Sequence, residues 1–259
     1  MAQALGIDIG GTGIKGAVVD LTTGELVTER HRVPTPDPST PHNVADVIVE
    51  ITKVHGWNGS IGATFPAVVK NGVAYSAANV DKSWIGTDVD SLFTKATNCS
   101  VTVMNDADAA GVAEVRFGAA KDVSGVVLLL TLGTGIGSAL FLDGKLVPNT
   151  ELGHLELDGL DAETQAAASA RDRSDLSWHQ WSKRLQHYLE FVERLFTPDL
   201  FVLGGGVSKK PDKWLPLLKV QTPIKVAQLA NNAGIVGAAI VAHESDAAPP
   251  PAGGRAADA

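Results

Sequence analysis

Cysteine is nearly absent from this chain of 259 residues, because Cys99 is the only one. A single cysteine cannot form an intramolecular disulfide, and it excludes a zinc site built from cysteines alone. This scarcity fits a reducing compartment, so we expect a cytoplasmic protein. Hydrophobic residues make up 44% of the chain and charged residues 19%, which is the composition of an ordinary globular protein.

Long apolar runs and an excess of basic residues are missing as well. The apolar run at 126–130 is far shorter than the roughly 20 residues that cross a bilayer. The first residues lack the basic start and apolar core of a secretion signal, so we expect no membrane partner. The formal net charge of −8 argues against a general nucleic-acid binder, which needs a basic face. A local basic groove for a small anion remains compatible with this charge.

Two glycine-rich segments are present instead, and they look like diverged copies of one unit. The first occupies residues 5–27 and the second residues 129–147. Each pattern predicts a strand, a tight glycine turn, a second strand, a polar turn and a short strand. Backbone N–H groups in such turns form concave anion sites, and the missing side chains let phosphate oxygens approach. Two facing turns therefore predict a phosphate chain held from both sides.

The first turn has competing interpretations. Residues 11–16 match the G-x-G-x-x-G pattern of dinucleotide-binding folds, but that pattern requires a helix next, and residues 17–21 are rich in β-formers. A plain hairpin turn is the other alternative, and the second copy weighs against it. Asp8 before the turn suits either hydrated Mg²⁺ or a turn cap. Lys15 suits either a phosphate contact or a solvated strand position.

The rest of the chain predicts alternating strands and helices. We expect strands at 4–9, 14–20, 25–33, 60–65, 101–104, 200–203 and 224–227, and a set of strands within 126–147. We expect helices at 43–55, 105–117, 162–170, 176–196 and 234–243. The proline-rich stretch at 34–41 predicts a loop, and the composition from Ser245 onward predicts a disordered tail.

An asparagine–aspartate pair, Asn105 and Asp106, follows one predicted strand and opens a predicted helix. A carboxylate at the carboxyl end of a strand lies at the cleft of an open α/β sheet. There Asp106 could accept a proton from a sugar hydroxyl, while Asn105 could bind a neighbouring hydroxyl. Capping of the helix N-terminus explains the pair equally well. Asp108 is the weaker candidate base, because it falls inside the helix.

Two further segments carry polar or glycine-rich patterns. Glu151 and His154 stand three residues apart around a glycine, and together they offer acceptors and donors to a polyhydroxylated substrate. A structural turn is one alternative, and a metal site is another that lacks a second pair of ligands. The run 204–208 follows a strand and could let a phosphate chain pass close to the backbone. The lysines just beyond it favour a basic path only weakly over a solvated surface.

Taken in order, these motifs resemble the ROK family of sugar kinases, within the actin-like ATPase superfamily. The matching segments are 8–12, 105–106, 132–137, 151–154 and 204–208. Many members carry a lysine where Gly13 stands, and many carry a cysteine-rich zinc motif soon after the histidine. This chain has no cysteine there, so we expect no zinc site. Both departures resemble the actinobacterial glucokinases that use polyphosphate, some of which also use ATP and accept mannose.

The resemblance implies a role for each segment. Asp106 would be the general base toward the sugar 6-hydroxyl. The sugar would be bound by Asn79, Asn105, Glu151, His154 and Glu163, the last replacing the glutamate that follows the zinc motif in relatives. The polyphosphate or ATP donor and its Mg²⁺ would be surrounded by Asp8, Gly10, Gly11, Thr12, Gly13, Lys15, Gly133, Thr134, Gly135, Gly205 and Gly206, with Asp8 beside the metal.

The fold class implied by the resemblance is α/β, a two-lobed actin-like ATPase fold with duplicated ribonuclease-H-like mixed sheets flanked by helices. We expect the first lobe at 1–118 and the second at 119–244, with the last helix packed on the first lobe and a tail at 245–259. The protein would act as a monomer or homodimer.

The activity implied is transfer of the terminal phosphoryl group of polyphosphate or ATP to the 6-hydroxyl of glucose, with mannose as a further acceptor. Two alternatives are a strictly ATP-dependent kinase for another hexose and a non-catalytic sugar-binding protein. Some ROK members are repressors with a DNA-binding domain ahead of the first glycine turn. Because only a few residues precede Asp8 in this sequence, we expect a kinase and not a repressor of this kind.

Overall fold

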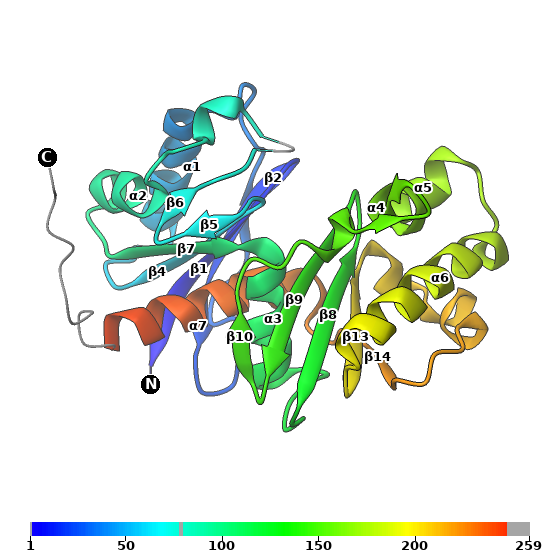
Figure 1. Ribbon diagram of the computed structural model, residues 1–259. Coiled ribbons are helices and arrows are strands. Elements are labelled where there is room, and N and C mark those ends of the chain that lie inside the picture. Colours follow the sequence, from blue (N-terminus) through cyan, green and yellow to red (C-terminus); the bar gives the residue numbers. More distant parts are fainter. Residues whose placement is uncertain (1, 78–79, 248–259) are drawn as a thin grey trace, which may run out of the picture.

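Two five-stranded sheets with the same plan form the centre of the molecule, as Figure 1 shows. They are seen in a computed structural model, which describes residues 2–77 and 80–247. Asn79, one of the predicted sugar-binding residues, lies outside the described residues.

The strand order repeats between the two sheets. The first sheet has the order β3-β2-β1-β4-β7, with β1 at Gln3–Gly10, β2 at Gly13–Asp20, β3 at His31–Val33, β4 at Ile61–Phe65 and β7 at Val101–Asn105. The second has the order β10-β9-β8-β13-β14, with β8 at Val126–Leu132, β9 at Ile136–Leu142, β10 at Lys145–Val147, β13 at Leu200–Gly205 and β14 at Ile224–Val226. In both, three antiparallel strands are extended by two parallel ones. The duplicated α/β fold class is therefore confirmed.

Helices cover both sheets. They are α1 (Pro41–Val54), α2 (Val89–Thr97), α3 (Asp106–Phe117), α4 (Ala162–Ala166), α5 (Ala168–Arg173), α6 (Trp178–Phe196) and α7 (Ala233–Ala247). Figure 1 shows α1 and α2 on one face of the first sheet, α7 across its other face, and α6 beside the second sheet. Apolar side chains on alternate strand positions face these helices and form the buried cores. Among the described residues, none of the helices is long and apolar enough to cross a membrane.

The C-terminal helix α7 lies against the first sheet with its backbone almost touching the strands. A Cβ atom on Gly6 would lie 1.9 Å from the carbonyl oxygen of Ile235, and one on Gly62 would lie 1.8 Å from that of Ala238. Only glycine leaves room for this approach. Helix α7 thereby returns to β1 and β4, and its start lies beside Asp8 near the end of β1.

Two predicted element boundaries are wrong because side chains take over backbone hydrogen bonds. The strand expected at 25–33 is interrupted. Leu26 makes an isolated bridge with Val19, the N–H of Val18 then donates to Thr28 Oγ1 at 3.0 Å, and regular pairing resumes only in β3. The helix expected at 162–170 divides at Ala167, which has an extended ψ of 158°. The indole of Trp181 donates to the carbonyls on both sides of this break, at 3.1 Å each.

The start of the predicted tail is also wrong. Helix α7 continues to Ala247, and Ser100 donates a hydrogen bond to Asp246 at 2.8 Å. The remainder of the predicted tail, 248–259, lies outside the described residues. The sequence pattern also missed α2 and two small hairpins, one of β5 (Val69–Lys70) and β6 (Val73–Ala74), the other of β11 (Glu156–Leu157) and β12 (Leu160–Asp161).

Candidate active site

A cavity of about 200 Å³ lies where elements of the two sheets meet. Four of the predicted site residues line it, from three separate segments: Asp8, Lys15, Asp106 and Gly205. The other polar or glycine residues of its wall are Glu114, Thr131, Gly204, Asn231 and Gly234. The fold thus gathers the paired strands on either side of the first glycine turn, the start of α3, the end of β13 and the start of α7 around one space. The turn residues themselves, 10–13 and 133–135, are not part of its lining.

The carboxylate of Asp8 is held from two sides at the edge of this cavity. Asp8 and Lys15 are directly paired across β1 and β2, so their side chains lie on the same face of the sheet. Lys15 Nζ lies 3.0 Å from one carboxylate oxygen, and Thr64 Oγ1 donates to the other at 3.0 Å. Asp8 is thereby fixed in orientation and keeps a cation beside it.

A positively charged side chain that the sequence analysis did not predict, Arg32 of β3, lies over the first glycine turn, residues 10–13. Arg32 donates to the carbonyl of Thr12 at 2.8 Å, and a Cβ on Gly13 would lie 2.6 Å from its guanidinium. Glycine at this position therefore leaves room for Arg32 over the turn. On the other side, the hydroxyl of Thr35 donates to the carbonyl of Gly10 at 2.5 Å.

The second glycine turn, residues 133–135, is fixed by its neighbours. The backbone N–H and the hydroxyl of Ser169 donate to the carbonyls of Gly133 and Thr134, at 3.0 and 2.6 Å. Glu163 accepts a hydrogen bond from the N–H of Ile136 at 3.0 Å, and a Cβ on Gly135 would lie 2.2 Å from its carboxylate. Glu163 thus lies against the turn, in space that only glycine leaves open.

The third glycine-rich segment ends β13. Gly205 has a left-handed φ of 81°, and a Cβ there would lie 2.4 Å from the carbonyl oxygen of Leu132. Gly206 begins a short 3₁₀ turn at Gly206–Lys209. This backbone borders the cavity on the side of the second sheet, so a chain of phosphates in the cavity would meet main chain there.

At the start of α3, the two members of the asparagine–aspartate pair have different roles. Asn105 is the N-cap, and its side-chain oxygen accepts from the N–H groups of Ala107 and Asp108 at 2.8 and 3.1 Å. Its amide nitrogen donates to the carbonyl of Ala67 at 3.1 Å. Asp106 is the first helical residue, and it lines the cavity. Helix capping is therefore carried mainly by Asn105. Asp106 also accepts from the N–H of Ala107 at 2.9 Å, but its carboxylate remains on the cavity wall, where a ligand can meet it.

The pKa of Asp106 is raised from 3.8 to about 6. Solvent reaches its side chain through the cavity, but the protein around it limits hydration, and this desolvation is the main cause. The negative charges of Asp8 and, more weakly, Glu151 raise it further. A carboxylate with this pKa is ionised at neutral pH and is a stronger base than an ordinary aspartate.

The pH dependence of turnover should report this carboxylate. If Asp106 must be ionised to act, kcat/KM for the sugar should fall about tenfold per pH unit below about pH 6. The measurement is a rate profile from pH 5 to 8.5. The control is Asp106→Asn, whose residual rate should lack this acidic limb. An unchanged kcat/KM down to pH 5 would contradict the assignment.

Asp108 is buried and does not line the cavity. One of its carboxylate oxygens accepts from the N–H of Asn149 at 2.8 Å, and the other has no hydrogen-bond partner among the described residues. Burial raises the pKa of Asp108 to about 7. Because Asp108 lies inside the helix and binds a backbone N–H group, its role is structural. Asp106 is therefore the better candidate for contact with a ligand.

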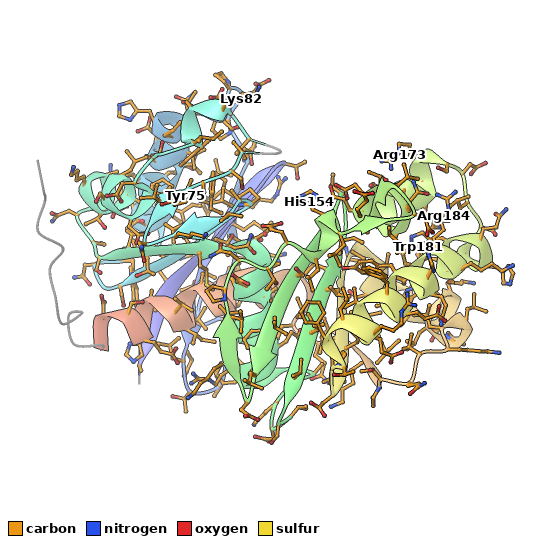
Figure 2. The ribbon with its side chains drawn as sticks, in the orientation of Figure 1. Tyr75, Lys82, His154, Arg173, Trp181 and Arg184 are labelled. Atoms are coloured by element: carbon orange, nitrogen blue, oxygen red, sulfur yellow. The ribbon has the colours of Figure 1, made fainter. Side chains whose placement is uncertain are left out.

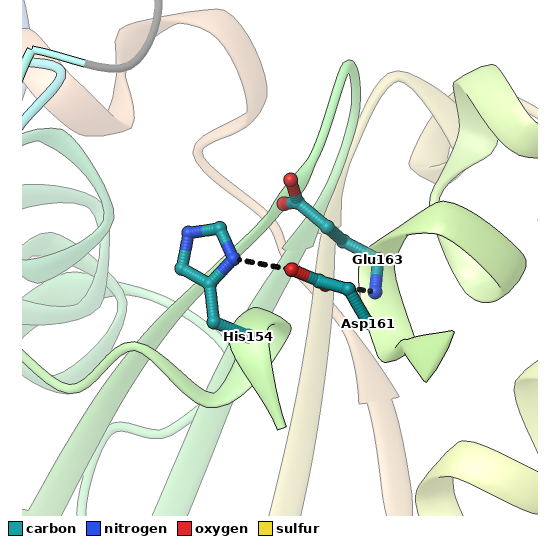
Figure 3. A group of neighbouring side chains, drawn as sticks. All are labelled: His154, Asp161 and Glu163. Atoms are coloured by element: carbon teal, nitrogen blue, oxygen red, sulfur yellow. Dashed lines mark hydrogen bonds and ion pairs between the residues drawn. The ribbon is translucent and has the colours of Figure 1, made fainter. Parts of the chain in front are cut away.

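We call the part of the molecule built on the first sheet the first half, and the part built on the second sheet the second half. The predicted sugar-binding residues of the second half lie close to one another. His154 Nδ1 lies 2.9 Å from a carboxylate oxygen of Asp161, which raises the pKa of the histidine. Figure 3 shows this pair with Glu163 beside it, and one ligand atom from each of the three lies within 4.8 Å of the others. Figure 2 shows His154 on the side of the second half that faces the first. Glu151 lies nearby with an exposed side chain, and partial desolvation by the surrounding protein raises its pKa.

Comparison with known proteins decides the family. Residues 4–170 match the ROK family, and the chain is 51% identical over 239 residues to the polyphosphate glucokinase of Mycobacterium tuberculosis, a match that covers 92% of this chain and 90% of the relative. The chain belongs to the ROK family.

Solved structures agree with that membership. The inorganic polyphosphate/ATP-glucomannokinase of Arthrobacter sp. strain KM is 54% identical, with a TM-score of 0.90 over 95% of this chain and 100% of that one. A ROK-family glucokinase from Streptomyces griseus, in complex with glucose and AMPPNP, is 25% identical, with a TM-score of 0.77 over 94% of this chain and 100% of that one.

Several residues of this ROK site were absent from the sequence prediction. Thr64 and Arg32 act through Asp8 and the first turn, and Asn231 and Gly234 border the cavity from the start of α7. A Cβ on Gly234 would lie 3.1 Å from the carboxylate carbon of Asp8. The glycines and alanines within 233–239 could have indicated part of this arrangement, because such small residues are typical of a helix whose backbone packs closely against its neighbours. Nothing in the sequence pattern placed that helix at the cavity.

Proposed function

We propose that this ROK protein transfers the terminal phosphoryl group of inorganic polyphosphate to the 6-hydroxyl of glucose. ATP is a second donor and mannose a second acceptor in the same proposal. The observation that carries it is Asp106, a carboxylate of raised pKa that lines one cavity with the Asp8–Lys15 pair and the glycine backbone of β13. The 51% identity to a polyphosphate glucokinase supports the choice of donor and acceptor.

In this proposal Asp106 takes the proton of the attacking hydroxyl. The 6-hydroxyl oxygen bonds to the terminal phosphorus, the bond from phosphorus to the bridging oxygen breaks, and the shortened polyphosphate leaves with that oxygen. Phosphoryl transfer of this kind depends mainly on positioning and on neutralisation of charge. Asn105, Glu151, His154 and Glu163 are proposed to orient the sugar.

Charge on the donor is proposed to be met by the two glycine turns, by Lys15 and by Mg²⁺. The residues present fit a hydrated magnesium ion, because Asp8 and Asp106 place carboxylate oxygens on the wall of the same cavity and Mg²⁺ prefers oxygen ligands. Asp8 would hold it. A bound magnesium ion supplies neutralisation of the phosphoryl oxygens. We also propose a cytoplasmic location, where reduced Cys99 and soluble substrates are expected.

The test compares two donors and two acceptors in one design. Purified protein is given long-chain polyphosphate or ATP, each with glucose or mannose and Mg²⁺, and hexose 6-phosphate is measured. We expect product from polyphosphate and glucose without nucleotide, and loss of the rate when Mg²⁺ is chelated. Turnover with ATP alone would contradict the polyphosphate assignment and favour the ATP-dependent alternative. Sugar binding without turnover with either donor would favour the non-catalytic alternative.

A further inference from the structure

Asn149 forms an unusual bridge between the two halves of the molecule. It lies in the connection that follows β10 of the second sheet, two residues before Glu151. Its side-chain oxygen accepts from the N–H of Val69 at 2.9 Å, and its side-chain nitrogen donates to the carbonyl of the same residue at 2.9 Å. Val69 belongs to β5, just after β4 of the first sheet. One side-chain amide therefore satisfies both backbone groups of a residue in the other half.

The backbone of Asn149 is also tied to the first half. Its N–H donates to the buried carboxylate of Asp108 in α3 at 2.8 Å. Its φ is 59°, a left-handed conformation that asparagine tolerates better than most residues. The conformation and three hydrogen bonds fix Asn149 against β5 and α3.

The residues that follow Asn149 are held by the second half instead. Ser138 in β9 donates to the carbonyl of Thr150 at 2.7 Å, and its hydroxyl oxygen accepts from the N–H of Leu152 at 3.0 Å. Glu151 thus stands between an anchor on the first half and an anchor on the second. The same segment of the first half also holds Asn105. The side-chain amide of Asn105 donates to the carbonyl of Ala67, two residues before the Val69 that binds Asn149.

We propose that Asn149 is a positioning residue that sets Glu151 relative to Asn105 and so assembles the sugar site from both halves. The proposal rests on the proposed function, since it takes Glu151 to contact the sugar. It assigns no contact between Asn149 and the phosphate donor, because neither glycine turn is bonded to it. Loss of the amide should therefore weaken the use of sugar far more than the use of donor.

The experiment replaces the amide without disturbing the backbone. Asn149→Gly keeps the left-handed φ and removes both hydrogen bonds to Val69. Asn98→Gly is the matched control, because Asn98 also has a left-handed φ, of 57°, and is exposed at the end of α2. We expect roughly a tenfold rise in the KM for the sugar in Asn149→Gly, as two interactions of modest strength are lost. The KM for polyphosphate should stay within twofold, and Asn98→Gly should match the wild type.

Hydrogen exchange gives a second readout that does not depend on activity. The amide of Val69 should exchange faster in Asn149→Gly than in the wild type or in Asn98→Gly. Faster exchange with an unchanged sugar KM would overturn the positioning role and leave a structural bridge only. An equal rise in both KM values would also overturn it. A wild-type protein that phosphorylates no hexose would instead overturn the proposed function, so the two failures are distinguishable.

Discussion

Replacement of Asp106 by asparagine is expected to lower kcat by roughly 10²- to 10⁴-fold, the range that a general base contributes. The asparagine keeps the shape of the side chain and an oxygen that can accept from the N–H of Ala107, so α3 should begin where it does now. The KM for the sugar should change little, because the base acts on the hydroxyl proton in the transition state. Steady-state kinetics of the purified variant provide the measurement.

Stability separates this effect from misfolding. Asp106 has a folded-state pKa of about 6 against 3.8 unfolded, so between these values the folded protein binds more protons than the unfolded chain. Ionisation of Asp106 therefore lowers stability as pH rises through this window. Asp106→Asn removes that penalty, and its midpoint of thermal unfolding at pH 7.5 should equal or exceed that of the wild type. A kcat within a few-fold of wild type would reject Asp106 as the base.

Removal of the Glu114 carboxylate is expected to cost about 3 kcal/mol of unfolding free energy. Glu114 is buried, and it accepts three hydrogen bonds from backbone N–H groups, those of Ala119, Gln228 and Leu229, at 2.7, 2.8 and 2.7 Å. In Glu114→Ala all three donors lose their partner, and each unsatisfied buried donor costs about 1–3 kcal/mol. The low end applies because Glu114 also lines the cavity, from which water can reach the donors.

The position of these donors adds a functional effect. Ala119 lies where the chain leaves α3 for the second sheet, and the other two residues lie where it returns to α7. One carboxylate thus holds both connections between the halves, and its loss should lower turnover as well as stability.

Denaturant unfolding of Glu114→Ala measures the effect on stability. Glu244→Ala is the matched control. Among the described residues its carboxylate pairs with Arg116 alone, in an exposed ion pair, and its loss should cost less than about 1 kcal/mol. Equal losses in the two variants would contradict the anchoring role.

The sequence alone predicted the elements whose pattern repeats along the chain or whose apolar residues recur with a clear period. The two glycine hairpins share a pattern, and both became the antiparallel half of a five-stranded sheet. The predicted strand and helix around the asparagine–aspartate pair correspond to β7 and α3. The order of the motifs along the chain then indicated the family resemblance, and the resemblance implied the residue roles, which periodicity alone does not predict.

Features that depend on tertiary contacts were beyond the sequence. The pattern did not indicate that Thr28 would end a strand or that Trp181 would divide a helix, since both act on residues 10 or more positions away. Arg32 reaches the first turn because Gly13 leaves space, and Asn149 meets Val69 across 80 residues. Such partners are set by packing of the two halves, so single-sequence patterns do not contain them.

The central claim is that the donor lies between the two glycine turns with the sugar hydroxyl beside Asp106. A crystal structure of Asp106→Asn with glucose and polyphosphate tests it most directly. We predict the 6-hydroxyl oxygen within about 3 Å of the side chain at position 106, and the terminal phosphate between residues 10–13 and 133–135. A sugar whose 6-hydroxyl points away from position 106, or a phosphate chain that contacts neither turn, would contradict the account.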